Sequence, residues 1–336
     1  MAFSFIETIT KQLERPSLGE QKAPTLWPSA ATATKDGEAV GKCRRQAFYR
    51  YVTDNYNFDE KFDSYKDLVQ RLEENKEPVS NYMKWIWKAG DLYEQYCIDL
   101  AKEAGVFVAT QVAIYIPKTN VSGKLDLVVI NPETSNYQIV EVKSVYGFNA
   151  NSVMGTDSQR RKGMMGEPRE SHLMQLGIYQ WWYGKPNGFD PGLLVYGARD
   201  TGKYSEYLVT IEQDEETQED FIHYQGNAPV VTPKVNSGIS MQNIMRNYKG
   251  LLDALESGEV PDRDYCLSYT PEMIDALYEK GLLTKTDTTQ YEKRKAQLAE
   301  GKARVVKAVE KGDWQCRFCA YQKTCYEEPD ESNAAQ

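Results

Sequence analysis

The spacing of apolar positions in the first third of the chain follows the helical period of about 3.6 residues. It predicts a helix over Lys61–Lys76 and a longer helix over Tyr82–Ala104. Residues 16–40 are rich in Pro, Ser, Thr and Ala with little periodicity, and they predict an irregular segment before these helices. One face of the longer helix carries Trp85, Ala89, Leu92, Tyr96 and Leu100.

From Phe107 the pattern changes to the two-residue alternation of strands. Three strands are predicted, over Phe107–Ile116, Lys124–Ile130 and Tyr137–Lys143. Residues 131–136, Asn-Pro-Glu-Thr-Ser-Asn, have the composition of a turn. Because the connections between these strands are short, we expect an antiparallel meander.

A polar, basic stretch, Gly155–Arg169, separates the meander from the rest of the chain. The pattern then predicts a helix over Ser171–Tyr183 and two strands joined by the turn 200–203. The sequence thus indicates an α/β protein, a central mixed sheet flanked by helices with a helical N-terminal arm and a C-terminal cap. The remaining predicted elements are the two strands Leu193–Ala198 and Tyr204–Ile211 and the helices Ser240–Glu256, Pro271–Lys280 and Thr286–Lys311.

The chain divides at the points where this pattern changes. Residues 1–40 form an irregular lead-in, 41–105 a helical region and 106–235 the central core. Residues 236–327 form a helical C-terminal region, and 328–336 are expected to be a disordered tail.

Composition narrows the class of protein. The chain has 336 residues, 41% of them hydrophobic, and no apolar run approaches the roughly 20 residues that span a membrane. The N-terminus lacks the basic and apolar regions of a secretion signal, so we expect a cytoplasmic protein without a membrane partner. The net charge of −9 argues against a broadly basic surface. It leaves nucleic acid open as a substrate, because a nuclease needs only a local basic groove.

Six cysteines in a reducing compartment indicate metal binding rather than disulfides. Three of them are closely spaced, Cys316-x2-Cys319-x5-Cys325, and Cys43 can complete the set if the chain ends meet. Four thiolates suit either zinc or an iron–sulfur cluster. The other two cysteines, Cys97 and Cys266, are expected to be ordinary buried thiols.

Two neighbouring predicted strands carry acidic and basic side chains. Glu141 and Lys143 are two residues apart and therefore point to the same face, and Asp126 lies on the preceding strand. Carboxylates are ligands for Mg²⁺ or Mn²⁺, and the backbone carbonyl of Val142 could add another ligand. A metal ion held there would polarise a phosphoryl oxygen, and the ammonium of Lys143 could orient water. Alone, such a pattern is more often a solvated strand face.

Further polar residues follow this pair. Gln175 and Tyr179 share one face of the predicted helix, and His172 lies one turn earlier, facing the same site or packing at the helix start. The basic run Arg160, Arg161 and Lys162 would bind phosphates at the rim of the site or lie in an exposed loop. Arg44 and Arg45, next to Cys43, could also bind phosphate.

Six segments together resemble, in order, the RecB-like iron–sulfur nucleases of the PD-(D/E)XK superfamily. The resemblance covers about residues 41–327 and is closest in layout to the CRISPR-associated exonucleases of that group. Each motif is weak by itself, and their shared order makes the resemblance specific. The segments are Cys43–Tyr49, Gly90–Glu94, Gly123–Asp126, Glu141–Lys143, Gln175–Tyr179 and the spaced Cys316, Cys319 and Cys325.

The resemblance implies a PD-(D/E)XK, restriction-endonuclease-like core over 106–235 and an iron–sulfur cap. It implies a [4Fe–4S] cluster on Cys43, Cys316, Cys319 and Cys325, in preference to zinc. The implied activity is hydrolysis of DNA, as a Mg²⁺- or Mn²⁺-dependent exonuclease acting on single-stranded ends.

The resemblance also implies roles for single residues. Asp126 and Glu141 would be metal ligands, with Glu94 as a third at a position where many members of the group have histidine. Lys143 would position or activate the attacking water. Gln175 and Tyr179 would orient Lys143 or the DNA.

Partners and competing interpretations follow. No Gly-x4-Gly-Lys-Ser/Thr loop is present, so unwinding would come from a partner helicase, or the chain would serve a recombination or adaptation complex. The sequence also leaves open whether the chain forms a homo-oligomer.

The main alternative function is a catalytically weak module that binds DNA ends. A third interpretation is an iron–sulfur redox protein that does not bind DNA.

Overall fold

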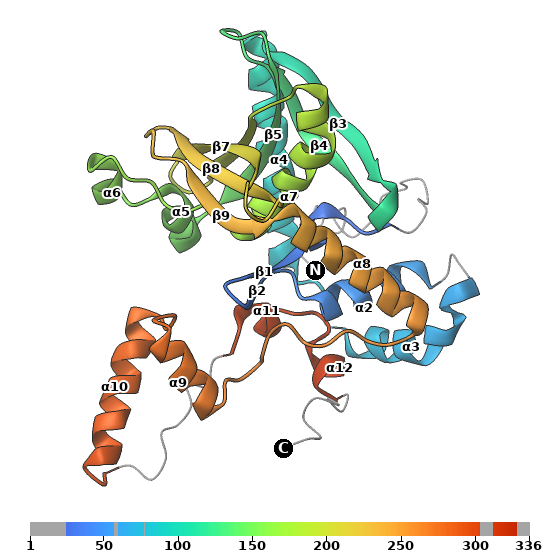
Figure 1. The fold of residues 1–336 in the computed structure, drawn as a ribbon, viewed down its shortest axis with the longest axis vertical. Coiled ribbons are helices and arrows are strands. Elements are labelled where there is room, and N and C mark those ends of the chain that lie inside the picture. The colour runs from blue at the N-terminus through green and yellow to red at the C-terminus, as the bar shows by residue number, and fades with distance from the viewer. Residues whose placement is uncertain (1–24, 57–59, 77, 303–311, 328–336) are drawn as a thin grey trace, which may run out of the picture.

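The computed structural model of the chain describes residues 25–56, 60–76, 78–302 and 312–327. A seven-stranded sheet forms its centre, and its spatial order follows the sequence (Figure 1). The strands are β3 (Phe107–Ile116), β4 (Val121–Ile130), β5 (Tyr137–Val145), β6 (Gly192–Ala198), β7 (Tyr204–Gln213), β8 (Asp220–Ala228) and β9 (Val235–Ser240).

The predicted meander is confirmed, because β3, β4 and β5 pair antiparallel. β5 then pairs parallel with β6, and the later pairs are antiparallel, so the sheet is mixed as expected. A parallel pair needs a crossover connection. Here the crossover contains the helices α5 (Gly147–Met154), α6 (Asp157–Arg161) and α7 (Glu170–Tyr179).

Two strands of this sheet were not predicted, β8 and β9 at one edge. Most residues of β8 are partly exposed, while β9 has three exposed and three buried residues, and each strand contains a glycine, Gly226 or Gly238. Neither strand shows the regular alternation that marks a half-buried strand. Pairing with β7 supplies the backbone hydrogen bonds that hold β8 in place.

Helices cover both faces of the sheet. The long helix α4 (Asn81–Glu103) packs through Ile98 against Val140 and Val142 of β5. Ile139 points to the other face, where it belongs to the main core with Leu176 of α7. Because successive strand residues alternate between faces, Glu141 points to the same side as Ile139, toward α7.

The structure confirms helix α4 but leaves the predicted apolar face of this helix mostly exposed. The residues that pack toward the sheet beside Ile98 are Tyr93, Cys97 and Ala101. Tyr93, Cys97 and Ala101 each lie one position after Leu92, Tyr96 and Leu100 of the predicted face. The helix therefore turns a different side toward the core. The exposed members of the predicted face are Trp85, Leu92, Tyr96 and Leu100.

The N-terminal part of the described chain is more regular than expected. Residues 32–41 form a hairpin of β1 (Thr32–Lys35) and β2 (Glu38–Gly41), after the short helix η2 (Pro28–Ala30). Its turn is Asp36-Gly37, and both residues have positive φ, 51° and 82°. An Asp-Gly pair with this geometry favours two-residue hairpins. The predicted lead-in over 1–24 lies outside the described residues.

Most of the remaining helices lie near the hairpin, while the two helices over 271–279 and 285–299 extend away from the sheet (Figure 1). The predicted helix over Lys61–Lys76 begins as a 3₁₀ segment, Glu60–Tyr65. The predicted helix to Lys311 ends at Ala299; residues 303–311, and the expected disordered tail 328–336, lie outside the described part. The bounds are α2 (Arg44–Asn55), α3 (Lys66–Asn75), α8 (Met241–Ser257), α9 (Pro271–Glu279), α10 (Lys285–Ala299), α11 (Trp314–Arg317) and α12 (Gln322–Glu327).

Candidate functional site

An acidic centre forms where strands β4 and β5 separate. The last backbone pair between them is Leu127 with Val140. Asp126 and Glu141, the next residues on the two strands, lie just beyond this last pair. The Oδ2 atom of Asp126 accepts the backbone N–H of Val142 at 3.0 Å. The Asp126 carboxylate thus accepts an N–H that a neighbouring strand would otherwise bond. This bond holds Asp126 against the backbone next to Glu141.

Lys143 joins the strand to helix α7. Its Nζ donates to Oε1 of Glu141 at 2.5 Å and to Oε1 of Gln175 at 3.2 Å. Glu141 is 0% exposed, and its second oxygen, Oε2, has no hydrogen-bond partner among the described residues. A buried carboxylate oxygen without a donor is costly, so this atom is where a further cation or donor would be most stabilised.

Burial also shifts the charges of this centre. It raises the pKa of Glu141 from 4.5 to about 8, despite the opposing charge of Lys143. It raises the pKa of Asp126 too. For Lys143, burial would lower the pKa, but the charges of Glu141 and Asp126 outweigh burial and raise it above 10.5. The centre therefore holds a charged lysine among carboxyl groups that resist ionisation without a cation.

Glu94 approaches this centre from α4. Its Oε1 accepts a hydrogen bond from Nε2 of Gln111 at 2.7 Å. Burial raises the pKa of Glu94, and the charge of Asp126 raises it further, while Lys143 lowers it. Glu94 therefore lies within electrostatic reach of the acidic centre, while its hydrogen bond is made to Gln111; its role as a metal ligand stays a prediction.

Tyr179 is buried beneath the same centre. A Cβ atom at Gly123 would lie only 2.8 Å from the Tyr179 hydroxyl and 3.0 Å from the ring of Pro28, so glycine is required there. Burial, and next the charge of Glu141, raise the pKa of Tyr179. The predicted Gly123 strand and Tyr179 helix segments thus fit together at one contact.

The carboxylates do not converge as a ligand set in this structure. Among the described residues, no three His, Cys, Asp or Glu side chains gather as ligands of a single metal ion. Glu94 bonds to Gln111 rather than to the other two carboxyl groups. The side chains of Asp126 and Glu141 contact each other, and burial together with this contact raises the pKa of Glu141. A proton on Glu141 permits this close approach of two carboxyl groups when no cation is bound.

The second candidate site is a small cavity between the chain ends. Cys43, Cys316, Cys319 and Cys325 all line this cavity of about 20 Å³. Cys43 is the N-cap residue of α2, and the other three lie on and between α11 and α12. The predicted meeting of Cys43 with the C-terminal cysteines is therefore present.

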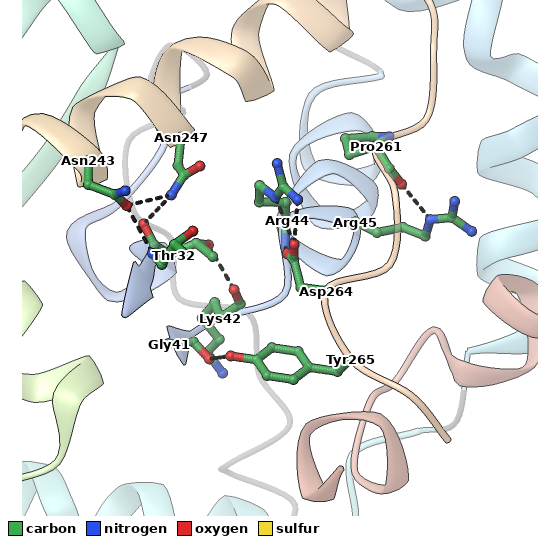
Figure 2. A network of polar contacts seen from close by, with 11 residues as sticks. Thr32, Gly41, Lys42, Arg44, Arg45, Asn243, Asn247, Pro261, Asp264 and Tyr265 are labelled. Carbon is green, nitrogen blue, oxygen red and sulfur yellow. Dashed lines mark hydrogen bonds and ion pairs between the residues drawn. The ribbon is translucent and has the colours of Figure 1, made fainter. Parts of the chain in front are cut away.

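A polar network holds the backbone next to Cys43, through Gly41 and Arg44 (Figure 2). Asp264 accepts the backbone N–H of Arg44 at 2.6 Å and its guanidinium at 2.6 and 2.8 Å. Tyr265, which also lines the cavity, donates its hydroxyl to the carbonyl of Gly41 at 3.0 Å. Both bonds fix the backbone on the two sides of Cys43.

The same network extends to the hairpin and to α8. The carbonyl of Lys42 accepts the hydroxyl of Thr32 at 2.7 Å, and Asn247 donates to the carbonyl of Thr32 at 3.0 Å. Asp264 and Tyr265 were missed by sequence reasoning, because nothing in the local pattern around them points to Cys43. Their distance along the chain from Cys43 hides this role.

The thiols are held in their neutral form. Burial raises the pKa of Cys43, of Cys316 to about 12 and of Cys319 to about 11. Each is raised further by the charge of another cysteine or of Asp264. Thiols that resist ionisation alone become thiolates when a metal centre binds, because the metal replaces the proton.

The predicted phosphate-binding arginines near Cys43 are already engaged. Arg44 is partly exposed and paired with Asp264, while Arg45 is buried and donates to the carbonyl of Pro261 at 2.6 Å. Arg45 thus contacts the backbone, a structural role that local sequence does not reveal.

The other predicted DNA contacts lie on the crossover. Arg160 donates to the carbonyls of Met154 and Tyr204, whereas Lys162 is exposed. Arg161 is exposed and donates to the carbonyl of Asp157 at 3.2 Å. Arg160 and Arg161 are the last residues of α6, and Lys162 is its C-cap residue.

His172 lies deeper than these three residues. Its Nδ1 is 3.0 Å from the hydroxyl of Tyr196. Burial, and next the charge of Lys143, lower its pKa well below 6.5. His172 thus contacts Tyr196 and lies within electrostatic range of Lys143, and it is neutral at pH 7.

Comparisons with known proteins find no relative of this chain. No family model matches the chain, and neither the curated proteins nor the solved structures contain a significant match to it. Of the helices in the described part, none combines the length and the apolar character needed to cross a bilayer.

Proposed function

We propose that the chain is a Mg²⁺- or Mn²⁺-dependent deoxyribonuclease with a PD-(D/E)XK core, acting as an exonuclease on single-stranded DNA ends. The observation that carries the proposal is the fully buried Glu141, whose Oε2 has no partner in the described residues while Lys143 and Asp126 lie beside it. Such an oxygen fits a divalent cation, with Asp126, the Val142 carbonyl and Glu94 as further ligands.

The chain's own residues can then perform the hydrolysis. A divalent cation, when bound, would polarise the phosphoryl group and acidify water. Lys143, fixed by Glu141 and Gln175, directs its ammonium at the attacking water and at the negative charge that develops on phosphorus oxygens. Tyr179 supports this helix face from below, through its contact at Gly123.

We further propose that the four cysteines hold a [4Fe–4S] cluster. The four thiols line one cavity, at the place where the two ends of the described chain meet. Four thiolates suit either one zinc ion or a four-iron cluster. We prefer the cluster because the spacing Cys316-x2-Cys319-x5-Cys325 with one remote cysteine resembles that of the iron–sulfur nucleases.

The test uses anaerobically purified protein and end-labelled single-stranded DNA with Mn²⁺, Mg²⁺ or EDTA. We expect metal-dependent shortening, reduced by at least 100-fold in Lys143→Ala and Glu141→Gln, since a positioned catalytic group contributes roughly 10²–10⁴-fold. The matched control is Lys234→Ala, which removes an exposed lysine also 2.5 Å from a glutamate, Glu212. Unchanged cleavage in the first two variants would refute the site assignment.

A second candidate function is a module that binds DNA ends and cleaves weakly. The observation favouring it is that Glu94, Asp126 and Glu141 do not converge on one point. If the cluster-loaded wild type binds single-stranded DNA but shows no metal-dependent cleavage, this second function replaces the first.

A further inference from the structure

A large groove lies beside the cysteine cavity and is separate from the acidic centre. Its volume is about 1090 Å³, above the roughly 300–1,000 Å³ of small-molecule sites. Its walls come from η2, α2, residues 75, 76 and 78–80, the first turns of α4 and the segment 317–326. It shares Gln46, Cys319, Gln322 and Tyr326 with the cysteine cavity, so the two are adjacent.

Aromatic side chains line this groove and stay accessible. Trp87 is 55% exposed and Phe318 is 80% exposed. Trp27 lies deeper and stacks with the guanidinium of Arg50, 4.2 Å from the ring centroid. Ring faces exposed this far are unusual on a surface without a partner, and they offer platforms on which planar groups can stack.

The charge of the groove is opposite to that of the whole protein. Five basic residues line it, Lys42, Arg50, Lys76, Arg317 and Lys323, although the chain carries a net charge of −9. The one acidic residue among its lining residues, Asp54, is 3.3 Å from Arg50 and is therefore already paired. A locally basic groove on an acidic protein selects a polyanion.

The walls of the groove are cross-linked across long sequence distances. Thr324 on α12 accepts a hydrogen bond from Asn75 at 3.2 Å and donates to the carbonyl of Arg71 at 3.3 Å. The rings of Tyr49 and Tyr321 pack edge to face with centroids 5.8 Å apart. The C-terminal wall is thus held by α2 and α3, so the groove is formed before any ligand arrives.

We propose that this groove binds single-stranded DNA, with bases stacked on Trp87 and Phe318 and phosphates paired with its basic residues. A single strand is the occupant that fits, because the faces of its bases are free to stack, whereas a duplex hides them. The proposal rests on the proposed function and deepens it, since it gives the nuclease a second, non-catalytic contact next to the cysteine cavity.

Binding is tested by fluorescence anisotropy of labelled oligothymidine in EDTA, where no cleavage occurs. One stacked base contributes roughly 5- to 150-fold in affinity, so Trp87→Ala and Phe318→Ala should each weaken binding by that factor. The matched control is Tyr96→Ala, since Tyr96 is on the same helix as Trp87 and 58% exposed but lies outside the groove. This control should bind like the wild type.

Salt dependence tests the charges separately. The plot of log affinity against log salt has a negative slope, and each phosphate contact that is lost should reduce its steepness by about 0.7. Lys76→Ala and Arg317→Ala should therefore each give a flatter plot. Because Phe318 neighbours Cys319, the iron content and melting temperature of Phe318→Ala are measured as well. If Phe318→Ala fails to fold, Trp87→Ala still tests the groove, because Trp87 is remote in sequence from the four cysteines of the cavity.

The outcomes separate the groove from the nuclease. Wild-type affinity in Trp87→Ala, or equal binding of duplex and single strand, overturns the groove proposal even if cleavage is normal. Weaker binding in Trp87→Ala but not in Tyr96→Ala supports it even if the wild type never cleaves. In that case the proposed nuclease function fails while the groove remains.

Discussion

The acidic centre and the cysteine cavity are built in opposite ways. The acidic centre comes from elements near one another in the sequence, β4, β5 and α7, whose pairing and periodicity place Asp126, Glu141 and Gln175 together. The cysteine cavity joins residues from both ends of the chain, Cys43 and Cys316. Its geometry depends on side chain–backbone bonds such as those of Asp264, which no single element provides.

The two sites also differ in how their charges are balanced. In the acidic centre Lys143 compensates the carboxylates within the protein. In the cavity, burial raises the pKa of Cys43, Cys316 and Cys319, so the thiols stay protonated until a metal centre replaces the proton. The first site is preformed by the fold, and the second would be completed by the proposed cluster. Substitutions should therefore affect activity at the first site and stability at the second.

The strongest test of this contrast is Cys319→Ala. If a cluster links Cys43 to Cys316 through the cavity, it closes a loop of nearly the whole described chain. By analogy with a disulfide, that closure stabilises the fold by on the order of 5 kcal/mol. We expect Cys319→Ala to lose iron and to unfold at a much lower temperature, measured by iron analysis and thermal denaturation.

The control is Cys97→Ala, because Cys97 packs against the sheet and does not line the cavity. It should keep its iron and lose only the packing of one thiol. A Cys319→Ala variant with the iron content and melting temperature of the wild type would contradict a cluster that stabilises the fold.

A smaller effect is expected from Asp264→Ala. Its carboxylate is almost fully buried and bonds both the guanidinium and the backbone N–H of Arg44, next to Cys43. Loss of charge-assisted bonds of this kind costs about 1.5–3 kcal/mol. We expect a lower free energy of unfolding in urea and faster loss of iron to a chelator, because Cys43 is less well positioned.

Asp157→Ala serves as its control, since Asp157 forms an exposed pair with Lys203, 2.5 Å away. Exposed pairs contribute little, so iron retention and stability should stay unchanged. Equal iron loss in both variants would show that the network of Figure 2 does not position the cluster ligand.

The same contrast explains how far the sequence could predict the structure. The strands β3, β4 and β5 were predicted because their apolar positions alternate strongly, and this alternation also places Glu141 and Lys143 on one face. The bond between Asp126 and Val142 could not be predicted, since it depends on where the pairing of β4 and β5 ends.

Features built from distant segments had no local signal. Asp264 lies far from Cys43 in sequence, and nothing in its neighbours indicates a contact with Arg44. The basic groove collects Trp27, Trp87 and Phe318 from three separate regions, so only the tertiary structure brings them together. Cysteine spacing was the exception, because the requirement of four ligands implied that the chain ends meet.

The smallest expected effect concerns His172, which senses the charge of the acidic centre. Burial, and then the charges of Lys143 and Arg169, lower its pKa well below 6.5 in the folded protein. When the pH falls below 6.5, the unfolded chain binds a proton at His172 and the folded chain does not, so stability decreases. His172→Gln should remove up to about 1.4 kcal/mol per pH unit of this loss.

The measurement is urea denaturation at pH 7, 6 and 5.5 for the wild type, His172→Gln and His223→Gln. The chain has two histidines, and His223 lies on β8, where its Nδ1 is 3.3 Å from the carbonyl of Phe221, so its variant serves as the control. A smaller loss of stability in His172→Gln alone would show that His172 is buried and resists protonation in the folded protein, as its contact with Tyr196 requires. Equal losses in all three proteins would mean that His172 is not buried there, and the packing of α7 beside the acidic centre would then be less preformed than the comparison with the cysteine cavity requires.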